Sequence, residues 1–157
     1  RYATYLAEDA EYLFVAYGSM SRICEAAVDQ AREAGYKVGL LRPITLFPFP
    51  EKQIKDMIPQ LKGILTVEMS AGQMVEDVRL AVEGRIPVEF YGRMGGIIPS
   101  PDEVLDAFVK FFKNTRKIII FPLFYLIGIY YFRSFLLIGL NSLYLIFLCC
   151  LNKKKGF

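Results

Sequence analysis

Histidine is absent from this sequence of 157 residues, and cysteine occurs only three times. Histidine is the commonest general base and the commonest metal ligand. The sequence therefore excludes both a histidine general base and a histidine-ligated metal site. Cys24 lies in a predicted helix, and Cys149 and Cys150 are adjacent. That spacing is not typical of a zinc site, an iron–sulfur site or a disulfide framework. We therefore interpret Cys24 as a small core residue and not as a nucleophile.

Acidic residues are missing from the last part of the chain. All 16 Asp and Glu residues precede residue 107, whereas residues 113–157 carry seven Lys and Arg. The net charge of +3 therefore sums an acidic and a basic segment, and it does not indicate a nucleic-acid partner. The chain begins at Arg1 and not at Met, so we expect a fragment of a longer polypeptide. We predict three parts: the end of an interdomain linker (1–10), an α/β domain (11–112) and a hydrophobic tail (113–157).

Strand and helix patterns alternate through residues 11–112. Short apolar runs predict buried strands over 12–17, 38–41, 64–68 and 88–91. Apolar positions at helical spacing predict helices over 21–34, 51–61, 73–82 and 101–112. Ser21 is the expected N-cap of the first helix, Gly35 follows its end, and Pro59 should end or kink the second. Four such units predict a three-layer α/β/α domain with a mostly parallel sheet.

Candidate functional residues follow the strands, because ligands and partners of open α/β sheets gather at the carboxyl ends of the strands. As candidates for an interface or an active-site rim we take Ser19, Arg42, Glu68, Gln73, Arg93, Gly95 and Gly96. The turn at Gly18 lacks both common nucleotide-binding fingerprints, which argues against a dinucleotide or triphosphate site. Its backbone amides can hold an anion or simply form an ordinary turn.

Glu68 ends an apolar strand, so its carboxylate needs a partner, and Arg42, Arg79 or Arg93 can supply one. A rim carboxylate and a structural ion pair are equally compatible with that position. The glycine-rich loop after the last strand lets backbone approach a ligand or a neighbouring subunit, or else forms a flexible connection. The apolar residues 97–98 favour a buried contact there. Since no complete catalytic or metal-binding set is found, the residues alone indicate a scaffold or assembly domain.

Four sequence blocks occur in an order typical of one family. They are residues 15–19 (VAYGS), 38–50 (VGLLRPITLFPFP), 67–79 (VEMSAGQMVEDVR) and 90–96 (FYGRMGG). Over residues 1–112 the chain resembles the carboxy-terminal domain of 2-oxoacid:ferredoxin oxidoreductase α subunits. The branched-chain (2-oxoisovalerate, 3-methyl-2-oxobutanoate) members are the most similar.

The resemblance implies the transketolase carboxy-terminal fold and a cytoplasmic enzyme. The whole enzyme would convert a 2-oxoacid and coenzyme A to acyl-CoA, CO2 and reduced ferredoxin, using thiamine diphosphate, magnesium and iron–sulfur clusters. In this family the thiamine site lies between a domain upstream of this one and a β subunit. The clusters lie on other domains or on an iron–sulfur subunit. The resemblance therefore implies no catalytic or metal-binding residue in this fragment, which should assemble the enzyme and be inactive alone.

The tail is the remaining feature. Residues 118–151 contain one charge, Arg133, and one proline, and basic clusters flank them. Arg133 divides the segment into runs shorter than the roughly 20 residues of a membrane span, which fits a re-entrant hairpin. A frameshift or read-through into AT-rich sequence would give the same composition. Two other functions thus stay open: a membrane-tethered α/β interaction module, with the membrane reached only through 118–151, and the carboxy-terminal domain of another thiamine-dependent enzyme.

Overall fold

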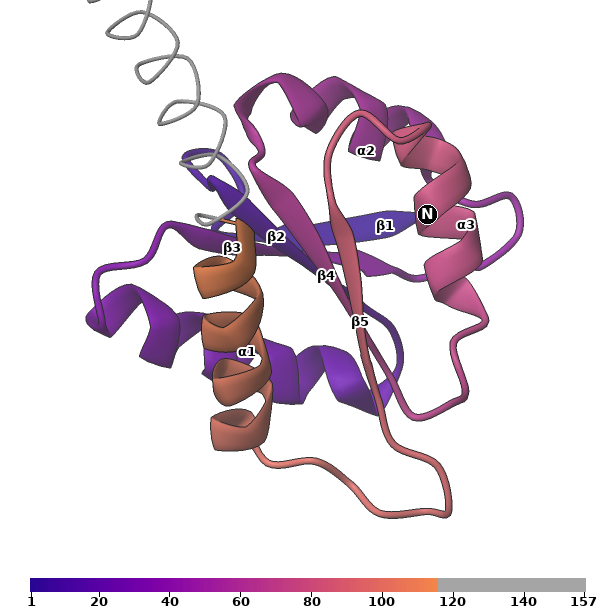
Figure 1. Cartoon of the computed structure of the whole chain (residues 1–157). Helices are drawn as coiled ribbons and strands as arrows, with labels where there is room; N and C mark the ends of the chain where they lie inside the picture. The colour runs from indigo at the N-terminus through magenta and orange to yellow at the C-terminus, as the bar shows by residue number, and fades with distance from the viewer. Residues whose placement is uncertain (116–157) are drawn as a thin grey trace, which may run out of the picture. The chain divides into compact units, whose positions relative to one another are not determined.

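The computed structural model describes residues 1–115, which form a five-stranded sheet with helices on both faces (Figure 1). The strand order is β1-β3-β2-β4-β5. Strands β3, β2, β4 and β5 are parallel, and β1 runs antiparallel to β3 at one edge. The strands are β1 (Tyr2–Tyr5), β2 (Tyr12–Ala16), β3 (Val38–Pro43), β4 (Gly63–Glu68) and β5 (Val88–Gly92).

Two helical layers enclose the sheet. The helices are α1 (Ser19–Glu33), α2 (Glu51–Met57), a short 3-10 helix (Ile58–Gln60), α3 (Met74–Val82) and residues 101–115. One buried cluster joins α1 and residues 101–115 to the sheet, and another joins α2 and α3 to its other face. The predicted three-layer α/β/α fold with a mostly parallel sheet is therefore confirmed.

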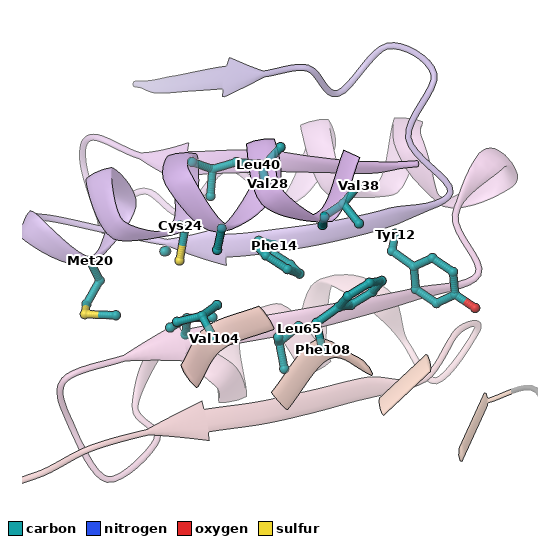
Figure 2. Close-up of a cluster of buried hydrophobic side chains, with 14 of the residues drawn as sticks. Tyr12, Phe14, Met20, Cys24, Val28, Val38, Leu40, Leu65, Val104 and Phe108 are labelled. Atoms are coloured by element: carbon teal, nitrogen blue, oxygen red, sulfur yellow. The ribbon is translucent and has the colours of Figure 1, made fainter. Parts of the chain in front are cut away.

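The core follows from the strict alternation of side chains along each strand. Phe14 points toward α1 and residues 101–115, whereas its neighbours Leu13 and Val15 point toward α2 and α3. Figure 2 shows the first cluster, in which Phe108 packs edge-on against Phe14 and Tyr12 at ring-centroid distances of 5.5 and 5.4 Å. Both faces of the central strand are apolar because both are covered, which explains the continuous apolar run at 12–16.

The ends of α1 differ in how well the sequence predicts them. The helix begins at Ser19, two residues before the predicted start, and Ser21 is not its N-cap. Instead the Ser21 hydroxyl donates to the carbonyl of Gly18 at 2.7 Å, from inside the first turn. The predicted end is correct, because Gly35 has a φ of +86° and Tyr36 donates its N–H to Ala31 at 3.0 Å. This is the glycine-terminated pattern that satisfies the last carbonyls of a helix.

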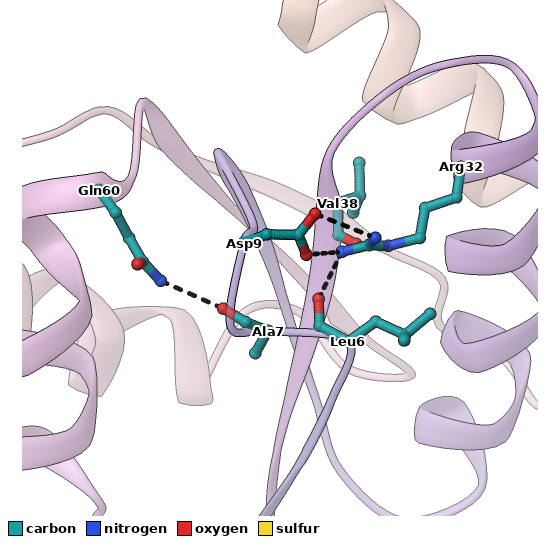
Figure 3. Close-up of polar contacts among 6 residues, drawn as sticks. All are labelled: Leu6, Ala7, Asp9, Arg32, Val38 and Gln60. Carbon is teal, nitrogen blue, oxygen red and sulfur yellow. Dashed lines mark hydrogen bonds and ion pairs between the residues drawn. The ribbon is translucent and has the colours of Figure 1, made fainter.

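Residues 1–10, which we expected to be the end of a linker, include the edge strand β1. All four residues of β1 are exposed, so no buried alternation marks the strand in the sequence. The connection from β1 to β2 is held by Arg32 of α1, which donates to the carbonyls of Leu6 and Val38 at 2.7 Å and pairs with Asp9 at 2.6 Å (Figure 3). Gly39 lies beneath it, where an added Cβ would come within 2.6 Å of the Leu6 carbonyl.

The last described helix includes residues 113–115, beyond its predicted end at Phe112. The predictions made for 118–151 fall outside the described residues. Among residues 1–115 there is no helix of the length and hydropathy that crossing a membrane requires. The boundaries of the three predicted parts remain predictions.

Candidate functional site

The carboxyl ends of the four parallel strands meet at one edge of the sheet. We call this edge the carboxyl rim, and it comprises the connections 17–18, 44–50, 69–73 and 93–100 together with the strand ends that they follow. Because β2 and β4 are the central strands, their connections lie between those of β3 and β5. All seven candidate residues belong to the rim or to the first residue of a helix that leaves it.

Glu68 is a fully buried charged residue of the rim, with an exposed fraction of 0%. Its carboxylate accepts the backbone N–H groups of Gln73, Met74 and Val75 at 3.2, 3.0 and 2.9 Å. The Ser70 hydroxyl donates to it at 2.8 Å. The carboxylate thus satisfies the first N–H groups of α3, at the end of the helix where the macrodipole favours a negative charge. Glu68 therefore fixes the turn from β4 into α3.

Two of the three arginines that could pair with Glu68 are engaged elsewhere. Arg79 pairs with Glu76 one turn along α3 at 2.6 Å, and Arg93 pairs with Glu103 at 2.8 Å. An ion pair between Glu68 and an arginine, one of the two arrangements that the sequence left open, is therefore not formed within residues 1–115. The physical reason is local, because backbone N–H groups and a hydroxyl only two to seven residues away provide enough donors for a buried carboxylate.

Gln73 is the N-cap residue of α3, and only its backbone takes part in the turn. Its N–H donates to Glu68 and its carbonyl accepts the N–H of Glu76 at 3.3 Å, while its side chain is exposed. Ser70 was not among the predicted site residues, although its hydroxyl also accepts the N–H of Gly72 at 3.4 Å. The signal that points to Ser70 is its type and place, because a serine between a strand and a helix N-terminus is a common donor and acceptor in such turns.

Arg93 joins two parts of the rim. Its backbone N–H donates to the carbonyl of Glu68 at 3.2 Å, while its guanidinium binds the Glu103 carboxylate. Glu103 in turn accepts the N–H of Ser100 at 3.1 Å, and the Ser100 hydroxyl accepts the N–H of Glu103 at 3.3 Å. This reciprocal pair is a capping box at the start of helix 101–115. The sequence carries the signal of this box, a serine three residues before a glutamate.

The other four candidates are not drawn into this network. Ser19 is exposed at the first position of α1, and Arg42 lies half-buried near the end of β3, opposite Ala3 of β1. Gly95 and Gly96 have φ angles of +83° and +77° and are exposed. No atom of residues 1–115 lies within 4 Å of a Cβ built on either glycine, so here they serve backbone conformation and not close packing.

Two connections of the rim expose large apolar side chains. Phe47 is 94% exposed, and five further residues of the same two connections are 46% to 66% exposed. On the connection after β3 they are Ile44 and Leu46, and on the connection after β5 they are Met94, Ile97 and Ile98. We call these six residues the apolar rim residues. Large exposed apolar side chains gathered on one connection are candidates for contact with another protein. The buried contact expected at 97–98 is not made within residues 1–115.

Metal-ligating and nucleophilic groups are not concentrated at the rim. No three His, Cys, Asp or Glu side chains in the described part of the chain gather closely enough to hold a metal ion. Cys24 is fully buried in the core cluster of Figure 2, and burial raises the pKa of its thiol to about 12. The prediction that Cys24 is a core residue is confirmed.

Comparisons with known proteins agree on one family. The family described as pyruvate:ferredoxin oxidoreductase core domain II matches residues 10–104. The ketoisovalerate oxidoreductase subunit VorB of Methanothermobacter marburgensis is 53% identical over 96 residues, which are 61% of this chain and 27% of that protein. The chain therefore spans about a quarter of the length of this curated relative.

Two solved structures share the fold. One is a 2-oxoglutarate:ferredoxin oxidoreductase from Magnetococcus marinus, with a TM-score of 0.62 and 20% identity over 70% of this chain and 19% of that one. The other is a split-gene transketolase, an inactive β4 tetramer, with a TM-score of 0.60 and 19% identity over 70% of this chain and 40% of that one. These similarities confirm the predicted transketolase-like fold.

Proposed function

Because the chain belongs to the pyruvate:ferredoxin oxidoreductase core domain II family, we propose that it is the assembly domain of a 2-oxoacid:ferredoxin oxidoreductase α subunit. The observation that carries this proposal is the family match together with 53% identity to a ketoisovalerate oxidoreductase subunit. The identity favours a branched-chain 2-oxoacid as the substrate of the whole enzyme. The whole enzyme would convert that acid and coenzyme A to acyl-CoA and CO2, with ferredoxin as electron acceptor, in the cytoplasm.

The geometry of the carboxyl rim supports an assembly role. The buried carboxylate of Glu68 is used to fix a turn, and the guanidinium of Arg93 is used to hold the start of helix 101–115. These two charged side chains are thus engaged in structure, whereas the apolar rim residues are exposed. A surface of this composition gains free energy by docking against another protein surface, because that removes apolar area from water.

The described residues offer no group of acidic, histidine or cysteine side chains that would hold a metal ion or an iron–sulfur cluster of the whole enzyme. Thiamine diphosphate requires a metal site with oxygen ligands, and iron–sulfur clusters require grouped thiolates. Neither grouping is formed by residues 1–115. We therefore derive no catalytic step through these groups from this chain. The proposed partners are a thiamine-binding domain upstream in the same subunit, a β subunit and an iron–sulfur subunit.

Co-purification and activity together test the proposal. A tagged full chain is co-expressed with the thiamine-binding domain, the β subunit and the iron–sulfur subunit of a ketoisovalerate oxidoreductase. We expect the tag to recover these polypeptides, and we expect no ketoisovalerate-dependent viologen reduction by the chain alone. Turnover by the isolated chain, or recovery of none of the partner subunits, would contradict the assembly role.

A further inference from the structure

The connection after β3 exposes its apolar side chains beside the start of β1. We propose that Ile44, Leu46 and Phe47 of this connection dock against the upstream, thiamine-binding domain of the same subunit. The inference rests on the proposed function, because that function supplies the upstream domain, and it adds the surface that this domain covers. Three features carry it: the course of β1, the bonds of residue 1, and the fixed conformation of the connection.

Strand β1 runs along the edge of the sheet between its two ends. It is antiparallel to β3, so that Tyr5 lies opposite Leu40 and Tyr2 lies opposite Pro43, the last residue of β3. All four residues of β1 are exposed, so the strand adds no side chain to the core. Followed backwards from β2, the chain is therefore led along β3 to the carboxyl rim, where residue 1 lies.

Residue 1 is bonded directly to the connection after β3. The Arg1 carbonyl accepts the N–H groups of Ile44 and Thr45 at 2.9 and 3.2 Å. The backbone nitrogen of Arg1 donates to the Thr45 hydroxyl at 2.7 Å. Because neighbouring Cα atoms of a chain are only about 3.8 Å apart, a residue joined to Arg1 also lies against this connection. A domain that enters here is thus held next to Ile44, Leu46 and Phe47.

The connection itself has a fixed conformation. Pro43 before it and Pro48 and Pro50 within it each restrict the backbone φ angle. Phe49 packs against the buried cluster of α2 and α3, whereas Phe47, two residues earlier, is 94% exposed. The exposure of Phe47 is therefore built into a rigid connection. A partner would bind side chains that are already in place, which lowers the entropy cost of docking.

A covalent tie favours the upstream domain over a separate chain as the occupant. A short tie converts docking into an intramolecular step, with an effective concentration on the order of millimolar. The tie is itself held in place, because Arg32 binds the carbonyl of Leu6 and the carboxylate of Asp9 at 2.7 and 2.6 Å. Docking then removes the apolar side chains of the connection from water, which supplies the favourable free energy.

Photochemical cross-linking from position 47 tests the proposal in the co-expressed complex. The tagged full chain carries p-benzoylphenylalanine in place of Phe47 or, as the matched control, in place of Leu80, which is 72% exposed on α3 and outside the rim. Its partners are the thiamine-binding domain, the β subunit and the iron–sulfur subunit of a ketoisovalerate oxidoreductase. We expect the probe at position 47 to cross-link to the thiamine-binding domain at least about tenfold more than the probe at position 80.

The cross-linked partner separates a failure of this inference from a failure of the proposed function. Suppose that the tag recovers the complex, but the probe at position 47 joins the β subunit, the iron–sulfur subunit, a second copy or its own chain. That result would overturn the inference alone, and so would equal cross-linking from positions 47 and 80. If the tag recovers none of these polypeptides, the proposed function is contradicted and the inference falls with it.

Discussion

The carboxylate of Glu68 accepts the backbone N–H of Val75 at 2.9 Å, although the two residues are seven positions apart. The bond joins the end of β4 to the first turn of α3. It places a full negative charge where the unpaired N–H groups of the helix point. The turn from β4 into α3 is thus held by a buried carboxylate that forms no ion pair with an arginine within residues 1–115.

Replacing Glu68 should destabilise the fold strongly. Glu68→Gln keeps the size but removes the charge and turns an amide NH2 toward N–H donors, so we expect a loss of about 2–3 kcal/mol in the free energy of unfolding. Glu76→Gln changes an exposed carboxylate on α3 and should cost no more than about 0.5 kcal/mol. Urea unfolding of the full chain measures both. Equal midpoints for the two variants would show that the Glu68 carboxylate does not hold the turn.

Stability at low pH should report the pair of Asp9 and Arg32. The hydrogen bond from Arg32 holds the pKa of Asp9 below its ordinary 3.8. The ionised carboxylate is therefore favoured in the folded chain, so its contribution is present above pH 3.8 and is lost as the pH falls through the lower folded value. We expect the stability gap between wild type and Asp9→Asn to close over that range. In an Arg32→Ala background the gap should be small at every pH, and a gap that persists there would disprove the assignment.

The thiol of Cys24 should be unreactive in the folded chain. Burial raises the pKa of its thiol from 9.0 to about 12, which lowers the thiolate fraction at neutral pH by roughly a thousandfold. In a Cys149→Ser/Cys150→Ser background, a disulfide reagent at pH 8 should find no reactive thiol until denaturant is added, and one equivalent afterwards. Rapid modification under native conditions would mean that Cys24 is accessible and not a core residue.

Phe47 should contribute to partner binding and not to folding. Its side chain is 94% exposed, so Phe47→Ser should change the free energy of unfolding by less than about 0.5 kcal/mol. The same variant should lower recovery of the co-expressed subunits about tenfold, because exposed aromatic anchors dominate interface energies. Leu80→Ser is the matched control, since Leu80 is 72% exposed on α3, outside the rim. Equal recovery of the subunits with both variants would show that the apolar rim residues do not form the interface.

The fold was largely predictable because its strong signals are local. Buried strands such as Tyr12–Ala16 and helices with one apolar face carry their periodicity in the sequence. Strand β1 carries none, because all four of its side chains are exposed and only pairing with β3 makes it a strand. The start of α1 was misjudged because a serine inside the first turn resembles an N-cap until its bond to Gly18 is seen.

The candidate site was only partly predictable. The position of Glu68 at the end of an apolar strand indicated a residue that needs partners, but the sequence could not show that backbone N–H groups supply them. The exposure of Phe47 was likewise invisible in a run of prolines and apolar residues. The partners of Glu68 and the exposure of Phe47 both depend on the conformation of a connection, and the spacing of apolar residues in the sequence does not encode that conformation. The roles of Ser19, Arg42, Gln73, Gly95 and Gly96 at an interface remain predictions.

The central claim is that this domain assembles an oxidoreductase whose chemistry lies elsewhere. The most direct test replaces the 96-residue matching segment of the M. marburgensis ketoisovalerate oxidoreductase subunit with the matching residues of this chain. Ketoisovalerate-dependent viologen reduction by the assembled chimera is then measured. We expect turnover within about tenfold of the parent enzyme, because docking surfaces and not reacting groups are exchanged. A chimera that assembles with all its subunits but does not turn over would contradict the claim.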